Sequence, residues 1–102
     1  MTRTTGLSEQ AIRAHLKILP GWELRGTKLW REITFPDFVT AFAFMTEVAL
    51  RAEKADHHPE WFNVYNRVRI ELATHDAGST VTEKDIRLAA EISRASERAG
   101  AA

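Results

Sequence analysis

The chain has 102 residues, with 14 lysines and arginines against 14 aspartates and glutamates, so its formal net charge is zero, and it contains no cysteine. This length suits a single domain with one hydrophobic core, and the interspersed charges argue against a protein that binds the phosphate backbone of nucleic acids. The lack of cysteine excludes disulfides, thiolate metal sites and a cysteine nucleophile, which leaves histidine, carboxylate and hydroxyl chemistry.

The first third of the chain predicts a helix followed by a β-hairpin. Ser8 is a suitable N-cap, and an apolar stripe at helical spacing then runs as far as Pro20 and Gly21. This stripe consists of Ile12, Leu16 and Leu19. Two β-prone runs follow, "WEL" and "KLWREITF", and the "RGT" between them contains the glycine that a tight turn needs. We therefore expect an antiparallel strand pair within residues 22–35.

A long helix is predicted over residues 36–54, because Pro36 suits a first helical turn and no glycine or proline interrupts the rest of this segment. Its expected buried stripe consists of Phe38, Phe42, Met45, Ala49 and Ala52. Further apolar residues lie off this stripe, namely Val39, Phe44, Val48 and Leu50. The apolar surface is wider than one sheet face would cover, so we expect this helix either to be deeply buried or to pack against another subunit.

The last third predicts a second strand pair and a final helix. Alternation in "FNVYNRVRIELATH" places apolar residues on one side of a strand, namely Val64, Val68, Ile70 and Leu72. A turn between Asn63 and Asn66 explains an interruption of this pattern, and the polar side predicts an antiparallel sheet with one open face. After the loop "DAGST", Thr82 and Asp85 have capping-box spacing. We expect a helix from this point, with capping as the role of Asp85.

The predicted order of elements is helix, two strands, helix, two strands, helix, written α-β-β-α-β-β-α. This order is typical of an α+β fold with a four-stranded antiparallel sheet and three helices packed on one face. We expect a single domain over residues 1–102, with frayed ends at 1–6 and 97–102. No apolar run approaches the roughly 18 residues that cross a bilayer, and the N-terminus has no signal-peptide pattern. We therefore expect a cytoplasmic protein with no membrane partner.

Three of the four histidines are candidates for proton chemistry, because histidine titrates near neutral pH. His57 and His58 stand directly before Pro59, which disfavours the helical region for His58, so the two rings are expected to point in different directions. His75 follows a strand and could return beside them, and Glu53 lies one helical turn before His57. The local pattern allows a polar helix end, an acid/base pocket, or a metal site formed by Glu53, His57 and His75.

The run "AEKADHHPEWFNVYNRVRIELATHD" closely resembles the pterin-4a-carbinolamine dehydratases, also known as dimerisation cofactors of a homeodomain transcription factor. The family pattern has an acidic residue, three intervening positions, two histidines and a proline, then an aromatic residue, a third histidine and a later aspartate. Every position is present: Glu53, His57, His58, Pro59, Tyr65, His75 and Asp85. In one departure, "HDAGSTVTEKD" lacks the second glycine of a Gly-Gly-Leu-Thr-like turn and is one residue longer, which bears on the pocket rim near His75.

The resemblance implies dehydration of 4a-hydroxytetrahydropterin, the product of aromatic amino-acid hydroxylases, to quinonoid dihydropterin and water. It implies no metal and no organic cofactor. Under this hypothesis the catalytic residues are His57 and His75, which transfer protons, and His58, which holds the pterin and polarises it at the 4a hydroxyl. Glu53 would orient a histidine or bind the pterin. The remaining expected substrate contacts lie at the ring edge: Pro59, Thr74 and Asp76.

The family also implies a homo-oligomer, a dimer or tetramer that forms through helix 36–54 and the sheet edge, with no direct nucleic-acid partner. Three alternatives stay open. A non-catalytic dimerisation or transcription-cofactor module would use the surface of helix 36–54, a molybdenum-cofactor-related pterin protein would use the same fold, and a metal-dependent hydrolase would need a bound ion. Glu53 and the three histidines favour catalysis, because a pure adaptor has no need of this constellation.

Overall fold

The computed structural model describes residues 5–101 of the chain. Along the sequence the elements are α1 (Glu9–Leu16), β1 (Glu23–Arg25), β2 (Lys28–Thr34), α2 (Phe38–Ala55), β3 (Glu60–Val64), β4 (Arg67–Leu72), the short 3-10 helix η1 (His75–Ala77) and α3 (Glu83–Arg98). The predicted order and the α+β class are confirmed. Of the ends expected to fray, residues 1–4 and 102 lie outside the described residues, and residues 97 and 98 belong to α3.

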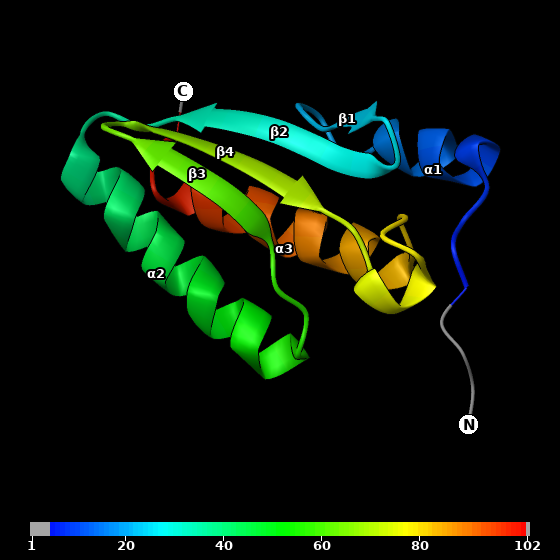
Figure 1. Ribbon diagram of the computed structural model, residues 1–102. Coiled ribbons are helices and arrows are strands. Elements are labelled where there is room, and N and C mark those ends of the chain that lie inside the picture. Colours follow the sequence, from blue (N-terminus) through cyan, green and yellow to red (C-terminus); the bar gives the residue numbers. More distant parts are fainter. Residues whose placement is uncertain (1–4, 102) are drawn as a thin grey trace.

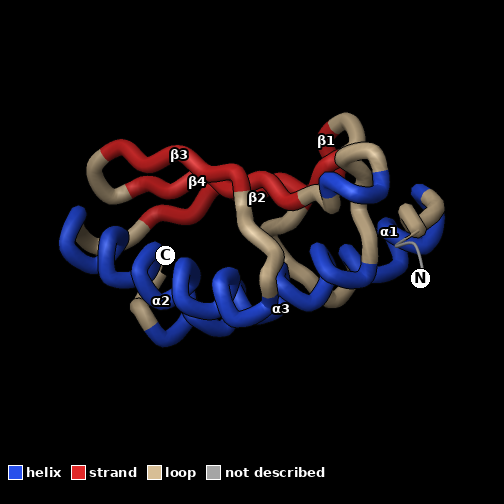
Figure 2. The backbone as a smooth tube through the Cα atoms, turned by 60° about the horizontal axis from the view of Figure 1, so that its bottom comes forward, coloured by secondary structure: helices blue, strands red, loops and turns tan. Residues whose placement is uncertain are grey.

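The four strands form one antiparallel sheet in the order β1-β2-β4-β3. Both hairpins are present where the turn residues predicted them, and β2 pairs with β4 in a register that places Leu29 opposite Leu72 and Ile33 opposite Val68. Helices α2 and α3 lie together on one side of the sheet (Figures 1 and 2), and α1 lies beside β1. Since Ile12 of α1 belongs to the same buried cluster, all three helices contribute to one core.

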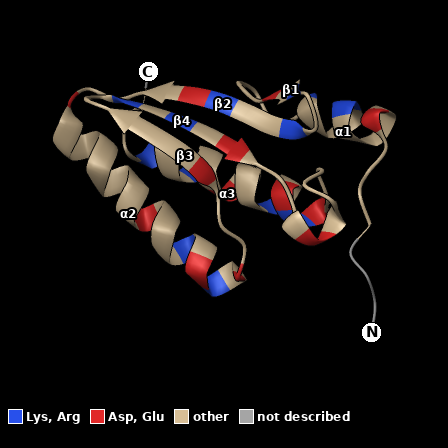
Figure 3. Ribbon diagram, viewed as in Figure 1, with Lys and Arg blue, Asp and Glu red and all other residues tan. Residues whose placement is uncertain are grey.

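The core lies between the sheet and the helix layer. Alternate residues of β2 and β4 are buried there, as the period of two along a strand requires. The largest fully buried side chains include Leu29 and Ile33 of β2, Ile70 and Leu72 of β4, and Leu88 and Ile92 of α3. The opposite side of the sheet carries most of the polar strand residues, so the prediction of one open face is confirmed. The predicted place of Val64 on the buried side is wrong, because Val64 pairs with Arg67 and is 44% exposed. Figure 3 shows positive and negative residues interspersed over the strands and helices.

The prediction of the buried stripe on α2 is wrong for most of its residues. The structure buries Ala41, Phe44, Val48 and Ala52, a set offset by one residue from the predicted one except at Ala52. One residue corresponds to about 100° around the helix axis. Both stripes are apolar, so periodicity alone had no means of choosing between them. The helix also begins at Phe38 rather than Pro36, because Asp37 is its N-cap and accepts a hydrogen bond from the Thr40 backbone N–H at 2.7 Å.

Much of the predicted stripe remains on the surface, although Met45 packs against the core. The large exposed apolar residues of α2 are Phe38, Val39, Phe42 and Leu50, which we call the outer α2 face. Within residues 5–101 no helix is long and apolar enough to cross a membrane.

Candidate active site

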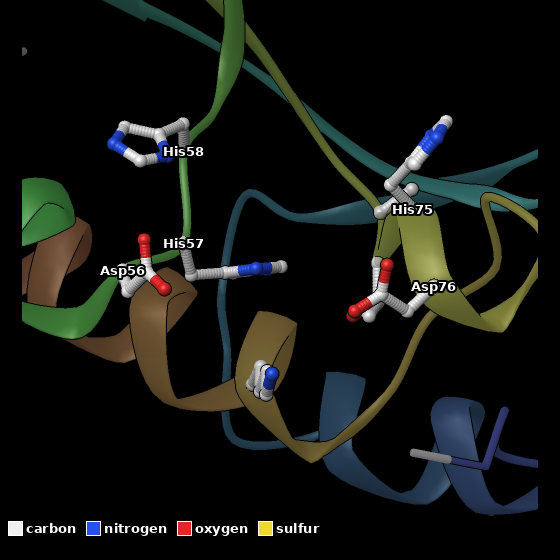
Figure 4. Close-up of a pocket in the computed structure, with 8 residues that line it drawn as sticks. Asp56, His57, His58, His75 and Asp76 are labelled. Carbon is white, nitrogen blue, oxygen red and sulfur yellow. The ribbon is translucent and has the colours of Figure 1, made fainter. Parts of the chain in front are cut away.

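A polar pocket of about 260 Å³ lies where the end of α2, the segment after β4 and the start of α3 meet (Figure 4). It is lined by Asp56, His57, His58, Ala73, Thr74, His75, Asp76 and Lys84. The fold therefore brings together His57, His58 and His75, as well as Thr74 and Asp76, all of which were expected at one site. Of the other predicted residues, Glu53 and Pro59 do not line the pocket and lie next to residues that do.

The backbone conformation at the end of α2 sets the directions of the His57 and His58 side chains. Asp56 has left-handed backbone angles, with φ 51° and ψ 43°. The backbone N–H of His57 donates to the carbonyl of Ala52 at 3.0 Å, and that of Asp56 donates to Glu53 at 3.1 Å. This pair of bonds is the Schellman pattern, which ends a helix and turns the chain sharply away. Pro59 disfavours helical backbone angles for His58, which lies beyond the end of α2, and the two histidine side chains leave the backbone in different directions (Figure 4).

His57 points into the pocket and is anchored by a buried carboxylate. Its Nε2 lies 2.6 Å from Oδ1 of Asp85, and only 9% of the residue is exposed, while Asp85 is completely buried. Asp85 also accepts from the backbone N–H of Thr82 at 2.9 Å, so the predicted capping box is confirmed. Capping was the main role predicted for Asp85, which is also a position of the family pattern, and the structure adds its direct contact with His57.

His58 turns away from His57 (Figure 4) and pairs with Glu53. The distance from its Nε2 to Oε1 of Glu53 is 2.9 Å, and the two side chains are 58% and 80% exposed. Of the two roles expected for Glu53, orienting a histidine therefore fits the geometry, and direct contact with a pocket ligand does not. Because the pair is exposed to solvent, its contribution to stability is small.

The opposite wall begins just after β4. Thr74 forms an isolated β-bridge with Thr80, and η1 starts at the next residue. In Figure 4 the carboxylate of Asp76 points across the pocket toward His57, whereas the ring of His75 points away from it. His75 is exposed, so its side chain has room to change rotamer. Asp76 is thus the side chain of this wall that already faces the pocket.

Comparison with known proteins agrees with this geometry. The family model described as Pterin 4 alpha carbinolamine dehydratase matches residues 5–95. The chain belongs to this family. It is 54% identical over 89 residues to a protein of Solibacter usitatus named "Putative pterin-4-alpha-carbinolamine dehydratase", covering 87% of this chain and 93% of that one. A protein of Nitrobacter hamburgensis with the same name is 60% identical over 85 residues, covering 81% and 83%.

A solved structure has the same fold. The crystal structure of a protein described as transcriptional coactivator/pterin dehydratase from Brucella melitensis superimposes with a TM-score of 0.85 at 45% identity, covering 89% of this chain and 98% of that one. Of the seven residues of the family pattern, the fold places the three histidines in the lining of one pocket, and Asp85 and Glu53 contact two of them. Tyr65 lies apart from the pocket lining, at the turn between β3 and β4.

Three pocket residues of this dehydratase-family protein were not predicted from its sequence: Asp56, Ala73 and Lys84. The sequence offered a signal for Asp56, because aspartate is one of the few residue types that tolerate the left-handed backbone angles with which helices often end, and Asp56 has these angles in the structure. Ala73 and Lys84 carry no such mark. They reach the pocket only because β4 and the start of α3 converge there.

The structure separates the three residues of the possible metal site. Within residues 5–101 no group of three histidine, aspartate or glutamate side chains is placed to hold an ion. The possible metal site of Glu53, His57 and His75 is therefore wrong as a geometric prediction, because Glu53 pairs with His58 and His57 pairs with Asp85. What remains at the pocket is a set of imidazoles and carboxylates that can accept and donate protons.

Proposed function

We propose that this protein catalyses the dehydration of 4a-hydroxytetrahydropterin to quinonoid dihydropterin and water, by general acid/base catalysis with histidine. The observation that carries the proposal is the pocket itself, in which His57, anchored by the buried Asp85, faces the wall of Thr74, His75 and Asp76. Membership of the dehydratase family supports this choice of substrate.

The reaction needs two proton transfers and no redox partner. The bond between C4a and its hydroxyl oxygen breaks, and the oxygen takes up a proton and leaves as water. A ring nitrogen loses its proton as the new C=N bond forms. Positioned acids and bases typically contribute about 10²–10⁴-fold to each such transfer. Histidine suits both tasks because it changes protonation near neutral pH.

The geometry supports a division of labour among the three histidines. His57 lies deepest and is the best-oriented candidate to receive the ring proton. His75 would supply the proton to the leaving hydroxyl after its ring turns toward the ligand, and His58, steadied by Glu53, would hold the pterin near that hydroxyl. Backbone groups next to Pro59 would contact the ring edge from the same wall as His58.

The pyrimidine edge of a pterin presents neighbouring N–H donors, for which a carboxylate is a matching acceptor. Asp76 is placed to accept them, because its carboxylate points into the pocket (Figure 4). Backbone groups around Thr74 line the same wall and would complete the contacts with the ring.

Optical measurement of carbinolamine dehydration tests the proposal. The wild-type protein should accelerate the reaction well beyond buffer, and His57→Ala and His75→Ala should each lower kcat by about 10²–10⁴-fold. His15→Ala is the matched control, because His15 is the histidine outside the pocket and should leave turnover unchanged. A wild-type rate equal to that of buffer would contradict the proposed reaction, and normal turnover in His75→Ala would remove that residue from the mechanism.

The outer α2 face supports a second element of the proposal, a homo-oligomer that forms through α2 and an edge of the sheet. Four large apolar side chains on one helix face are unusual on the surface of a monomer. A binding module of the transcription-cofactor type would use the same surface, and the description of the Brucella relative favours this as the second candidate function. Size-exclusion chromatography with light scattering should give more than one chain mass, and a clean monomer would contradict the oligomer.

Substitutions in the pocket and on the outer α2 face test the two candidate functions separately. His57→Ala should lower the rate of dehydration by about 10²–10⁴-fold and leave the assembly intact, whereas a charge introduced at Phe42 should disrupt the assembly. If dehydration is the physiological role, the enzyme acts in the cytoplasm after a reaction that hydroxylates with a tetrahydropterin, and it returns the pterin to the recycling pathway.

A further inference from the structure

The carboxylate of Asp85 is the centre of a fully buried hydrogen-bond network. It is contacted by Nε2 of His57 at 2.6 Å, by Oγ1 of Thr74 at 2.8 Å and by the backbone N of Thr82 at 2.9 Å. These partners come from three separate segments: the end of α2, the strand exit before η1, and the N-cap of α3. A charged carboxylate completely out of water is tolerated only when such donors satisfy it. One side chain therefore ties together both walls of the pocket.

The protons of this network can be assigned by counting donors. The backbone N–H of Thr82 can only donate, and it donates to Oδ2 of Asp85. The hydroxyl of Thr74 also contacts Oδ2, so Thr74 donates to Asp85 and must accept from the Thr82 hydroxyl, 2.6 Å away. The Thr82 oxygen in turn accepts from the backbone N–H of Lys84 at 3.2 Å. Each hydroxyl proton is used once, and every donor in the chain finds an acceptor.

This assignment decides which nitrogen of His57 carries the proton. An ionised carboxylate only accepts hydrogen bonds, and a neutral imidazole has one N–H donor and one acceptor nitrogen. Because Oδ1 of Asp85 faces Nε2, the proton lies on Nε2, and Nδ1 has a free lone pair. Nε2 is occupied by the buried carboxylate, so Nδ1 is the nitrogen through which His57 can take a proton from a ligand in the pocket.

We propose that Asp85 is a positioning residue that holds His57 as the Nε2–H tautomer, so that Nδ1 accepts the proton of the pterin ring nitrogen. The inference rests on the proposed dehydration, because it names the atom that carries out one of its two proton transfers. Asp85 acts only through His57 and does not touch the substrate. Asp85 also belongs to the capping box of α3. The same carboxylate therefore caps the start of this helix and fixes the orientation of the His57 ring.

The variant Asp85→Asn tests this with little change in shape. The amide oxygen can take the place of Oδ2 and keep the donors from Thr74 and Thr82. The amide NH₂ then faces Nε2 of His57, and since it is a donor, it requires an unprotonated Nε2 and places the proton on Nδ1. The substitution is expected to invert the tautomer and leave no free lone pair toward the pocket.

The tautomer is measured by NMR of the protein with ¹⁵N-labelled histidine, without any ligand, at about pH 8.5. We expect Nε2–H in the wild type and Nδ1–H in Asp85→Asn, together with a fall in kcat of about 10²–10⁴-fold and a smaller change in KM. Nδ1–H in the wild type, an unchanged tautomer in the variant, or kcat within twofold of the wild type would overturn the proposal.

The variant Thr82→Ala is a control that tests whether a loss of stability alone changes the tautomer of His57. It removes the side-chain cap of α3 and the bond to Thr74, but it leaves the contact between His57 and Asp85. This variant should lose stability and keep the Nε2–H tautomer, so an inverted tautomer there would also overturn the proposal. If Asp85→Asn does not fold, the wild-type tautomer alone decides. Failure of the wild type to dehydrate the carbinolamine would refute the proposed function, whereas the ligand-free spectrum tests the role of Asp85 independently.

Discussion

The observed buried stripe of α2 is offset by one residue from the predicted one, and this difference can be tested with two phenylalanines of the helix. Phe44 is 2% exposed and its ring centroid lies 4.7 Å from that of Phe35, whereas Phe42 is 55% exposed. Replacing a buried phenylalanine by alanine typically costs about 3–5 kcal/mol through lost transfer energy and the cavity left behind. The packed pair with Phe35 places Phe44 toward the upper end of that range. Phe42→Ala should change the stability of a single folded chain by no more than about 0.5 kcal/mol.

Urea unfolding followed by circular dichroism measures both free energies. A chain of this length is expected to have a free energy of unfolding of about 5–15 kcal/mol, so Phe44→Ala removes a large fraction of it. Protein concentration must be varied, because Phe42 lies on the outer α2 face and its loss should lower stability only in proportion to the oligomer present. Equal losses for the two variants at concentrations where the chain is monomeric, or a larger loss for Phe42→Ala, would refute the assigned buried stripe.

Two further predictions concern the ends of α2. Asp56→Gly should be as stable as the wild type or more stable by up to about 1 kcal/mol, because glycine adopts left-handed backbone angles without steric cost from a side chain. Asp56→Ala should be less stable than the wild type. Thermal unfolding measures both variants, and a higher stability for the alanine variant than for the glycine variant would contradict this prediction. The backbone hydrogen bond from Thr40 lowers the pKa of Asp37 from its ordinary 3.8. Its folded-state pKa is therefore below the unfolded one, so Asp37 stabilises the fold above the unfolded value and loses that contribution as the pH falls through the folded value. Acid unfolding should consequently weaken the wild type more than Asp37→Asn, and parallel pH profiles of the two would exclude this role.

The order of the elements and most of their ends could be predicted from the sequence alone, because caps and turns depend on residues a few positions apart. Thr82 and Asp85 identified the start of α3, and "RGT" identified the first hairpin. The histidine pair was recognisable for the same reason, since the effect of Pro59 on His58 is local. His75 was predicted to join them on the assumption that the strand returns, and β4 does return there.

Other features depended on neighbours that are distant in the sequence. Which apolar stripe of α2 is buried was decided by its packing against the sheet and α3, because both stripes satisfy helical periodicity equally well. Asp85 looked like a capping residue, and its second task appeared only when the fold placed it against a histidine 28 positions earlier. Residue types and spacing therefore determined the local elements and the candidate chemistry. Only the tertiary structure decided which carboxylate serves which histidine, because a hydrogen bond depends on the distance in space between two side chains and not on their separation along the chain.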